Sequence, residues 1–230
     1  MGPAATHDLL GKVIALTPAE TDQDHVPLVI WNVPQVPPRI PAIRGEGPSP
    51  LPAMAEGMRA LQSAGCEAIA IACNTAHHWA EALASEVSVP LLHIADAALA
   101  EIERESPGAR RAALLGTRGT LASGFYRRRL EPRGIEVIEP PEAIQQAVDA
   151  TIALVKKNRL GEARAAFAPV VHAMRADGAQ AIVLACTELP LAAPPRGPGP
   201  PLVDPTLALA RAIVEFARDS SCGSQERQVS

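Results

Sequence analysis

Two cysteines stand at the same place in a repeated phrase. Cys73 ends the segment GCEAIAIAC (65–73) and Cys186 ends GAQAIVLAC (178–186), with five of the nine aligned positions identical. Each cysteine follows a short apolar run of strand length, and polar residues come directly after it. Cysteine thiolates are bases as well as nucleophiles, so two equivalent thiols facing each other can remove a proton from one face of a carbon and return one to the other. The repeat therefore points to racemisation chemistry.

These thiols need strands to position them. In open α/β sheets, ligands bind beyond the carboxyl ends of the strands, which is where the pattern puts both cysteines. A helix is expected to begin after each one, and its positive dipole end lowers a thiol pKa, so we expect both cysteines to ionise readily. The alternative is a buried cysteine that acts as a small hydrophobic residue, and this is our interpretation of Cys66 in the core and of Cys222 as an idle thiol in the tail.

Strands and helices alternate along the chain. Helical spacing covers residues 52–64, 160–176 and 206–217, and short apolar runs predict strands at 68–72, 90–94, 112–115, 181–185 and 202–203. Strands that are apolar throughout indicate a parallel sheet covered on both faces.

The predicted fold is α/β, with two similar three-layer parallel-sheet domains and the active site in the cleft between them. The first domain is assigned to residues 1–96 plus 204–220 and carries Cys73. The second is assigned to residues 97–203 and carries Cys186, and residues 221–230 are expected to form a flexible tail.

Composition excludes several other classes of protein. The 230 residues carry a formal net charge of −4, with 47% hydrophobic and 20% charged residues, as in a soluble globular protein. Basic residues form no broad surface for nucleic acid. The sequence has neither a membrane-spanning apolar run nor a signal peptide, so a cytoplasmic protein without membrane contact is expected. Four cysteines without C-x-x-C spacing are then interpreted as free thiols.

Five motifs in order along the chain resemble the aspartate/glutamate racemase superfamily, and most closely its aspartate racemase branch. The two cysteine signatures are CNTAH (73–77) and ACTELP (185–190). The start MGPAAT (1–6) is similar to the family's GGMGPxAT, WNVPQVPPR (31–39) to its NPQIPDR, and LGTRGTLAS (115–123) to its LATxGTxxS. The pair Val155-Lys156 stands where that branch has VKxG.

The resemblance implies an isomerase that interconverts L- and D-aspartate without pyridoxal phosphate or metal, with Cys73 and Cys186 as the two proton donors and acceptors. It implies that Arg39 and Lys156 hold the side-chain carboxylate of a small acidic amino acid. The residues it places around the α-carboxylate are Asn74, Thr75, Thr117 and Thr187. It also suggests a homodimer. Glutamate or a broader range of amino acids stays open as the substrate.

The sequence departs from the family pattern in a few places. The branch normally has a strand that ends in Gly-Gly before the methionine, so a first N-terminal strand of about five or six residues is expected to be missing here. Smaller departures are Pro38 for an acidic residue, Ile40 for a threonine and Ile152 where a tyrosine is common. They leave the specificity for the substrate side chain less determined than the reaction.

Two further interpretations start from the same cysteines. Cys73, His77 and His78 cluster in sequence, and with Cys186 they would be candidates to bind zinc, although the spacing matches no standard zinc motif. A redox or ligand-sensing protein would instead join Cys73 to Cys186 on oxidation, which requires a closer approach than two thiols on either side of a substrate carbon. The lysines lie in no recognisable pyridoxal phosphate motif.

Overall fold

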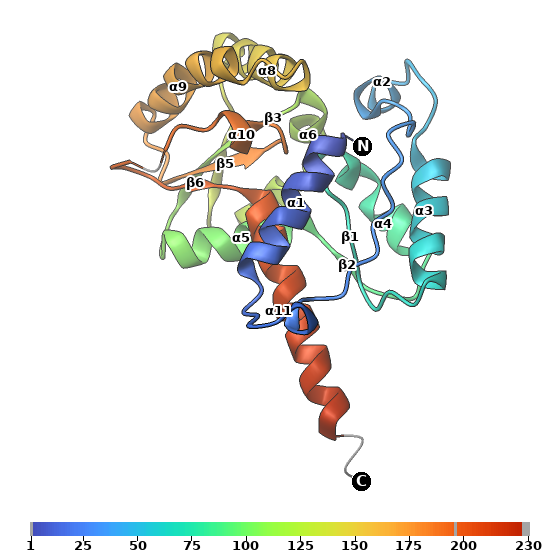
Figure 1. Ribbon diagram of the computed structural model, residues 1–230. Helices are drawn as coiled ribbons and strands as arrows, with labels where there is room; N and C mark the ends of the chain where they lie inside the picture. The colour runs from blue at the N-terminus through green and yellow to red at the C-terminus, as the bar shows by residue number, and fades with distance from the viewer. Residues whose placement is uncertain (1, 196, 227–230) are drawn as a thin grey trace.

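Two parallel sheets organise the chain, which the computed structural model describes for residues 2–195 and 197–226 (Figure 1). The larger sheet has the order β4 (Glu136–Ile138), β3 (Arg111–Gly116), β5 (Ala181–Ala185) and β6 (Leu202–Val203). The smaller sheet pairs β1 (Ile69–Ala70) with β2 (Leu91–Leu92). All four pairings are parallel, so the predicted parallel α/β fold is confirmed.

Helices connect the strands and cover the sheets. Those of eight residues or more are α1 (Pro3–Leu16), α3 (Leu51–Ser63), α5 (Ile94–Glu105), α8 (Glu142–Lys156), α9 (Leu160–Ala176) and α11 (Pro205–Glu226). The shorter α-helices are α2 (Arg39–Ile43), α4 (Ala80–Ala84), α6 (Arg118–Ser123), α7 (Arg127–Leu130) and α10 (Leu189–Ala192). The described residues also form the 3₁₀ turns η1 (Asp22–Asp24), η2 (Thr75–Trp79) and η3 (Glu131–Arg133).

The larger sheet lies between two helical layers (Figure 1). Alternate side chains of β3 and β5 point to opposite faces, because successive residues of a strand alternate in direction. Leu115 and Leu184 pack with α8 and α9 on one face, whereas Leu114 and Val183 pack with α5 and α11 on the other. This explains why both strands are apolar throughout.

Helix α11, the last element described, packs against α1 and α5. The first and last helices of the described chain therefore lie side by side. An ion pair between Lys12 and Asp204, 2.6 Å apart, strengthens this contact where α11 begins. The helix continues through Glu226, into the segment expected to be a flexible tail, and residues 227–230 lie outside the described residues. None of the helices within the described ranges is long and apolar enough to cross a membrane.

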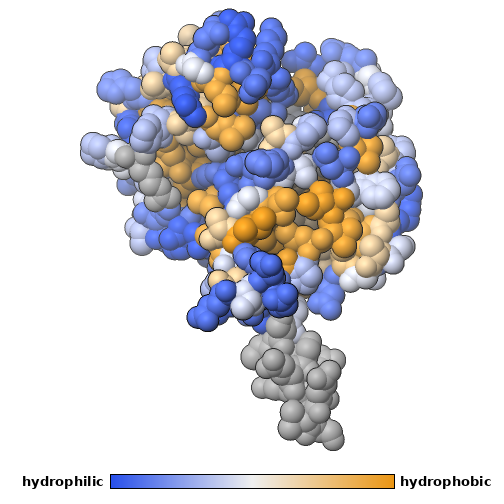
Figure 2. All heavy atoms as spheres, in the orientation of Figure 1, coloured by the Kyte–Doolittle hydropathy of each residue, from blue (hydrophilic) through white to orange (hydrophobic). Residues whose placement is uncertain are grey.

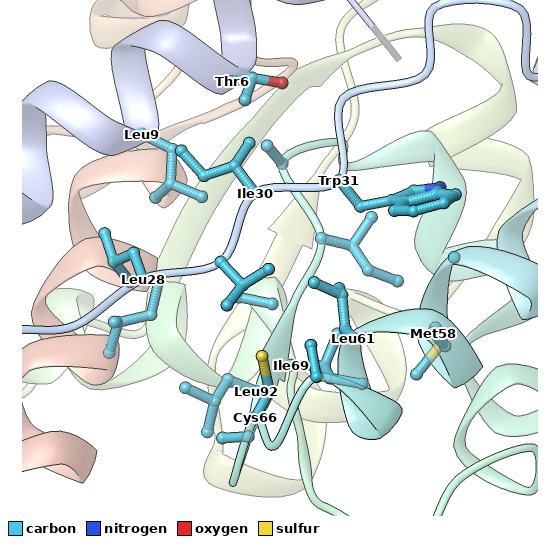
Figure 3. A pocket seen from close by; sticks show the side chains of 18 of the residues that line it. Thr6, Leu9, Leu28, Ile30, Trp31, Met58, Leu61, Cys66, Ile69 and Leu92 are labelled. Carbon is cyan, nitrogen blue, oxygen red and sulfur yellow. The ribbon is translucent and has the colours of Figure 1, made fainter.

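The smaller sheet borders a large apolar groove. Within the described residues, β1 has a strand partner along one edge only, and the groove of about 640 Å³ runs beside it between α1, α3 and the segment 26–33. Its lining includes Leu9, Leu28, Ile30, Leu61 and Ile69 (Figure 3). Figure 2 shows apolar residues gathered on the surface above the projecting end of α11. The first element described along the chain, α1, forms one wall of this groove.

Candidate active site

Both cysteines leave their strands with the same backbone geometry. The N–H of Cys73 donates to the carbonyl oxygen of Ile71 over 2.8 Å, and the N–H of Cys186 donates to that of Leu184 over 2.8 Å. Such a bond between residues two apart is the γ-turn that is common at strand ends. The repeated phrase therefore produces a repeated turn, with Cys73 three residues beyond the end of β1 and Cys186 directly beyond β5.

A cavity of about 160 Å³ brings the two cysteines together. It is lined by residues that follow β1 and by residues that follow β3 and β5, so both sheets contribute to it. All eight residues predicted for the site line this cavity: Arg39, Cys73, Asn74, Thr75, Thr117, Lys156, Cys186 and Thr187. Residues up to 148 positions apart in the sequence, Arg39 and Thr187, are thus brought to one place.

Cys186 is held as a protonated thiol. Its side chain is buried, and its Sγ donates to Oε2 of Glu188 over 2.9 Å. Burial, followed by the charge of the Glu188 carboxylate, raises the pKa of the Cys186 thiol well above its usual value, because both disfavour the thiolate. The expectation that Cys186 ionises readily at a helix N-terminus is therefore wrong. The helix that follows, α10, has only four residues, and the Glu188 carboxylate is in direct contact with the sulfur.

Three buried threonines form a cluster of hydroxyl groups at the side of the cavity. The Oγ1 atom of Thr75 lies 2.9 Å from that of Thr117 and 3.1 Å from that of Thr120. Thr117 is the N-cap of α6, and its Oγ1 accepts a hydrogen bond from the backbone N–H of Thr120. The cluster links the segment after β1 to the segment after β3, which keeps the two sides of the cavity in register.

The backbone at Cys73 is fixed by a buried histidine. His77 Nδ1 lies 2.8 Å from the carbonyl oxygen of Cys73, and the N–H of Ile94 donates to His77 Nε2 over 3.3 Å. Since a backbone N–H can only donate, Nε2 must accept and the proton lies on Nδ1. Burial lowers the pKa of His77 to about 4, so the ring is neutral near pH 7.

This arrangement does not support the zinc interpretation. His77 uses both ring nitrogens on backbone groups, and Nδ1 of His78 lies 3.0 Å from the hydroxyl of Ser123. Within the part of the chain that the structure describes, no group of three or more His, Cys, Asp or Glu side chains is placed to hold a metal ion.

Two cations border the cavity. Arg39 is half-buried, and its guanidinium donates to the carbonyl oxygens of Val36 and Pro37. No carboxylate among the described residues pairs with it, so donors of the guanidinium stay available to a ligand. Lys156 ends α8, and its Nζ lies 3.9 Å from Oε1 of Glu188.

Glu188 is the residue that our sequence reasoning did not place in the site. It lies two residues after Cys186, and its carboxylate contacts the Cys186 thiol and the Thr187 hydroxyl. The departures from the family pattern divide into two kinds. Pro38 and Ile40 line the cavity and make the wall beside Arg39 apolar, but Ile152 is buried in the core between α8 and α9.

A parallel α/β chain with two thiols at one cavity fits an enzyme of the isomerase class that moves protons. The comparison with known families agrees: the Asp/Glu/hydantoin racemase family model matches residues 1–213, and the chain belongs to this family of racemases.

Similar proteins cover almost the whole chain. The broad specificity amino-acid racemase of Bacillus subtilis is 30% identical over 218 residues, which is 93% of each chain. Among solved structures, the aspartate racemase of Picrophilus torridus is 34% identical with a TM-score of 0.83, covering 94% of this chain and 90% of that one. An aspartate racemase homologue of Pyrococcus horikoshii is 27% identical with a TM-score of 0.75, covering 94% and 95%.

Proposed function

We propose that this racemase interconverts L- and D-aspartate by a two-base mechanism in which Cys73 and Cys186 act on opposite faces of the substrate Cα. The observation that carries the proposal is that both thiols line one small cavity, each within three residues of the carboxyl end of a parallel strand. A single base would have to remove the α-proton from one face of Cα and then reach the opposite face to return a proton there. Two bases need only exchange their protonation states.

The environment of Cys186 gives the two thiols different starting roles. In the resting protein Cys186 carries its proton, because burial and Glu188 disfavour the thiolate. We assign it as the acid that delivers a proton while Cys73 removes the α-proton. In the reverse direction Cys186 must act as the base. Its thiol proton passes to the Glu188 carboxylate, which accepts the S–H hydrogen bond, the Cys186 thiolate then removes the α-proton, and the Cys73 thiol delivers a proton to the opposite face.

The carboxylates of the substrate need cationic and neutral donors. Arg39 has guanidinium donors available, and its planar group pairs well with a carboxylate, so we assign Arg39 and Lys156 to the side-chain carboxylate. We assign Asn74, Thr75, Thr117 and Thr187 to the α-carboxylate. Donors at this position also stabilise the negative charge that develops when the α-proton leaves.

The test is racemisation of L-aspartate in D₂O, followed by NMR at Cα and by chiral chromatography, with metal and pyridoxal phosphate withheld. A two-base enzyme delivers solvent deuterium to the D-aspartate product, while the remaining L-aspartate keeps its protium early in the reaction. Deuterium that appears equally in both enantiomers at early times would exclude two separate bases.

Variants separate the cysteines. Cys73→Ala and Cys186→Ala should each lower racemisation by about 10²–10⁴-fold, the usual contribution of a general acid or base. Cys66→Ala is the matched control, since Cys66 lines the apolar groove beside β1 and not the catalytic cavity. Full turnover by either Cys73→Ala or Cys186→Ala would refute the mechanism.

A second candidate is a racemase with broad specificity. The observation that favours it is the apolar wall formed by Pro38, Ile40 and Pro41 beside Arg39, which leaves room for a substrate side chain without charge. A panel of L-aspartate, L-glutamate and neutral amino acids distinguishes the two. Aspartate specificity predicts that the wild-type protein turns over aspartate alone and that Arg39→Met abolishes this activity. Neutral substrates turned over by the wild-type protein at rates similar to aspartate would favour broad specificity.

A further inference from the structure

Asn74 leaves one polar group without a partner in a buried place. Its side chain is only 2% exposed and lines the catalytic cavity next to Cys73. Nδ2 of its amide is buried and has no hydrogen-bond partner in the structure. Because an unpaired buried donor is costly, such a group is expected to meet an acceptor that the protein does not itself supply.

The other end of the same amide is firmly held. The hydroxyl of Tyr126 donates to Oδ1 of Asn74 over 2.6 Å, and both groups are buried. An amide has donors at one end and an acceptor at the other, so a bond at Oδ1 determines which end is left over. In this orientation the remaining end is the NH₂ group, which suits a carboxylate.

The position of Tyr126 is itself well defined. Gly124 ends α6 with φ of +65°, a left-handed conformation that glycine adopts easily, and the chain turns there into the core. The rings of Phe125 and Tyr126 pack with centroids 5.0 Å apart, and Phe125 in turn packs against His93 at 5.5 Å. Burial raises the pKa of Tyr126 well above its usual value, so its hydroxyl stays protonated and able to donate.

We propose that Tyr126 is a positioning residue, which fixes the side-chain amide of Asn74 so that its NH₂ group is presented to a carboxylate of the substrate. This inference rests on the proposed function, because it takes a carboxylate as the ligand. Without the Tyr126 hydroxyl the amide is free to turn and present Oδ1, and an oxygen facing a carboxylate repels it. Tyr126 acts through Asn74 and does not touch the substrate.

A double-mutant cycle with Tyr126→Phe, Asn74→Ala and the double variant tests this relation. Tyr126→Phe should lower kcat/KM for aspartate about tenfold, which corresponds to about 1.4 kcal/mol and is within the net contribution of one hydrogen bond. In the Asn74→Ala background the same change should cost less than twofold. An equal loss in both backgrounds, or no loss in either, would overturn the proposal.

A purely structural role must be distinguished by a matched control. Thr151→Val removes another fully buried hydroxyl, which bonds to the backbone of Ala147 inside α8, away from the cavity. It should lower the melting temperature about as much as Tyr126→Phe while leaving KM and kcat unchanged. If Thr151→Val lowers kcat/KM as much as Tyr126→Phe, the effect at Tyr126 is one of stability, and the proposal fails.

Binding of succinate separates this inference from the proposed function, since succinate is a dicarboxylate that has no amino group and cannot be racemised. Calorimetry should show weaker binding in Tyr126→Phe, with the same coupling to Asn74 as in the kinetics. Coupled succinate binding without aspartate turnover would leave the positioning role intact and refute the proposed function. Aspartate turnover, with no coupling between Tyr126 and Asn74 in binding or in kinetics, would leave the proposed function intact and refute the positioning role. Absence of both aspartate turnover and succinate binding would refute both proposals.

One measurement needs no folded variant of Tyr126. In the NMR spectrum of the wild-type protein, the side-chain amide signals of Asn74, identified by their loss in Asn74→Ala, should shift on saturation with succinate. Unchanged signals at saturation would overturn the proposal.

Discussion

Gly116 is the last residue of β3 and lies close to the backbone of β5 beside the site. It pairs with Ala185 in the parallel ladder of β3 and β5, and the next residues are Thr117 and Cys186. A Cβ at Gly116 would lie 2.7 Å from the carbonyl oxygen of Ala185 and 3.2 Å from its Cβ. These contacts are too short, and the obstacle is backbone in the middle of a sheet, which cannot move aside as a flexible side chain can.

We therefore expect Gly116→Ala to push β3 and β5 apart at the cavity. Overpacking of a well-packed core by one methyl group costs about 1–3 kcal/mol of unfolding free energy. At about 2–4 °C per kcal/mol for a chain of this size, the melting temperature should fall by about 2–12 °C. Because Thr117 and Cys186 move with the strands, kcat/KM should fall up to about 10²-fold, as for a displacement of about 1 Å in a catalytic site.

Thermal unfolding and the racemisation assay measure the two effects, and Gly161→Ala is the control. Gly161 lies in α9 with no atom near the position of an added Cβ, so alanine there should raise stability by about 0.4–1 kcal/mol and leave activity unchanged. If Gly116→Ala unfolds at the wild-type temperature and keeps full turnover, the reasoning from this close approach is wrong.

Three other predictions follow from the structure. The neutral, buried His77 has a pKa of about 4 against 6.5 in the unfolded chain, so the stability it contributes is complete above pH 6.5 and should fall by about 3 kcal/mol as the pH drops to 4. Urea unfolding should show a smaller pH slope in His77→Asn, whereas the exposed His172→Gln should keep the wild-type slope, and equal slopes in all three would contradict this. Glu188→Gln removes a charge that raises the pKa of Cys186, so the pH midpoint for alkylation of Cys186 by iodoacetamide should move lower, and a move to higher pH would refute the assignment. An apolar strand of about six residues joined ahead of residue 1 should fill the groove beside β1 and raise the melting temperature. A Gly/Ser segment of the same length should leave the melting temperature unchanged, and equal effects of the two segments would show that the groove does not accept a strand.

The class of fold was predictable because local patterns agree with it. The helix over residues 160–176 and the strands over 181–185 and 202–203 begin and end as predicted. Periodicity is a reliable signal where an element has a long apolar stripe or is buried on both faces. Near Cys73 the prediction was less accurate, since the strand 68–72 is reduced to Ile69–Ala70 and the expected helix begins as a 3₁₀ turn. In the described chain β1 pairs along one edge only, and fewer ladder bonds extend it.

The candidate site could be listed from sequence motifs, and the structure brings all eight predicted residues to one cavity. What the motifs did not indicate was the electrostatics within it. Burial and the Glu188 carboxylate raise the pKa of Cys186. Neither the burial of the thiol nor the side-chain orientation of Glu188 can be inferred from the spacing of residues in a motif. The contact between Tyr126 and Asn74 joins residues 52 positions apart and was equally hidden.

The sequence by itself determined the chemistry available to this protein: two thiols after two parallel strands, with polar residues beside each. Local apolar patterning is sufficient for this, because it specifies where each strand ends. Only the tertiary structure decided that Cys186 holds its proton, which end of the Asn74 amide is left for a substrate, and where the apolar groove opens beside β1. These properties depend on burial and on contacts between distant segments, which exist only once the sheets and helices have packed.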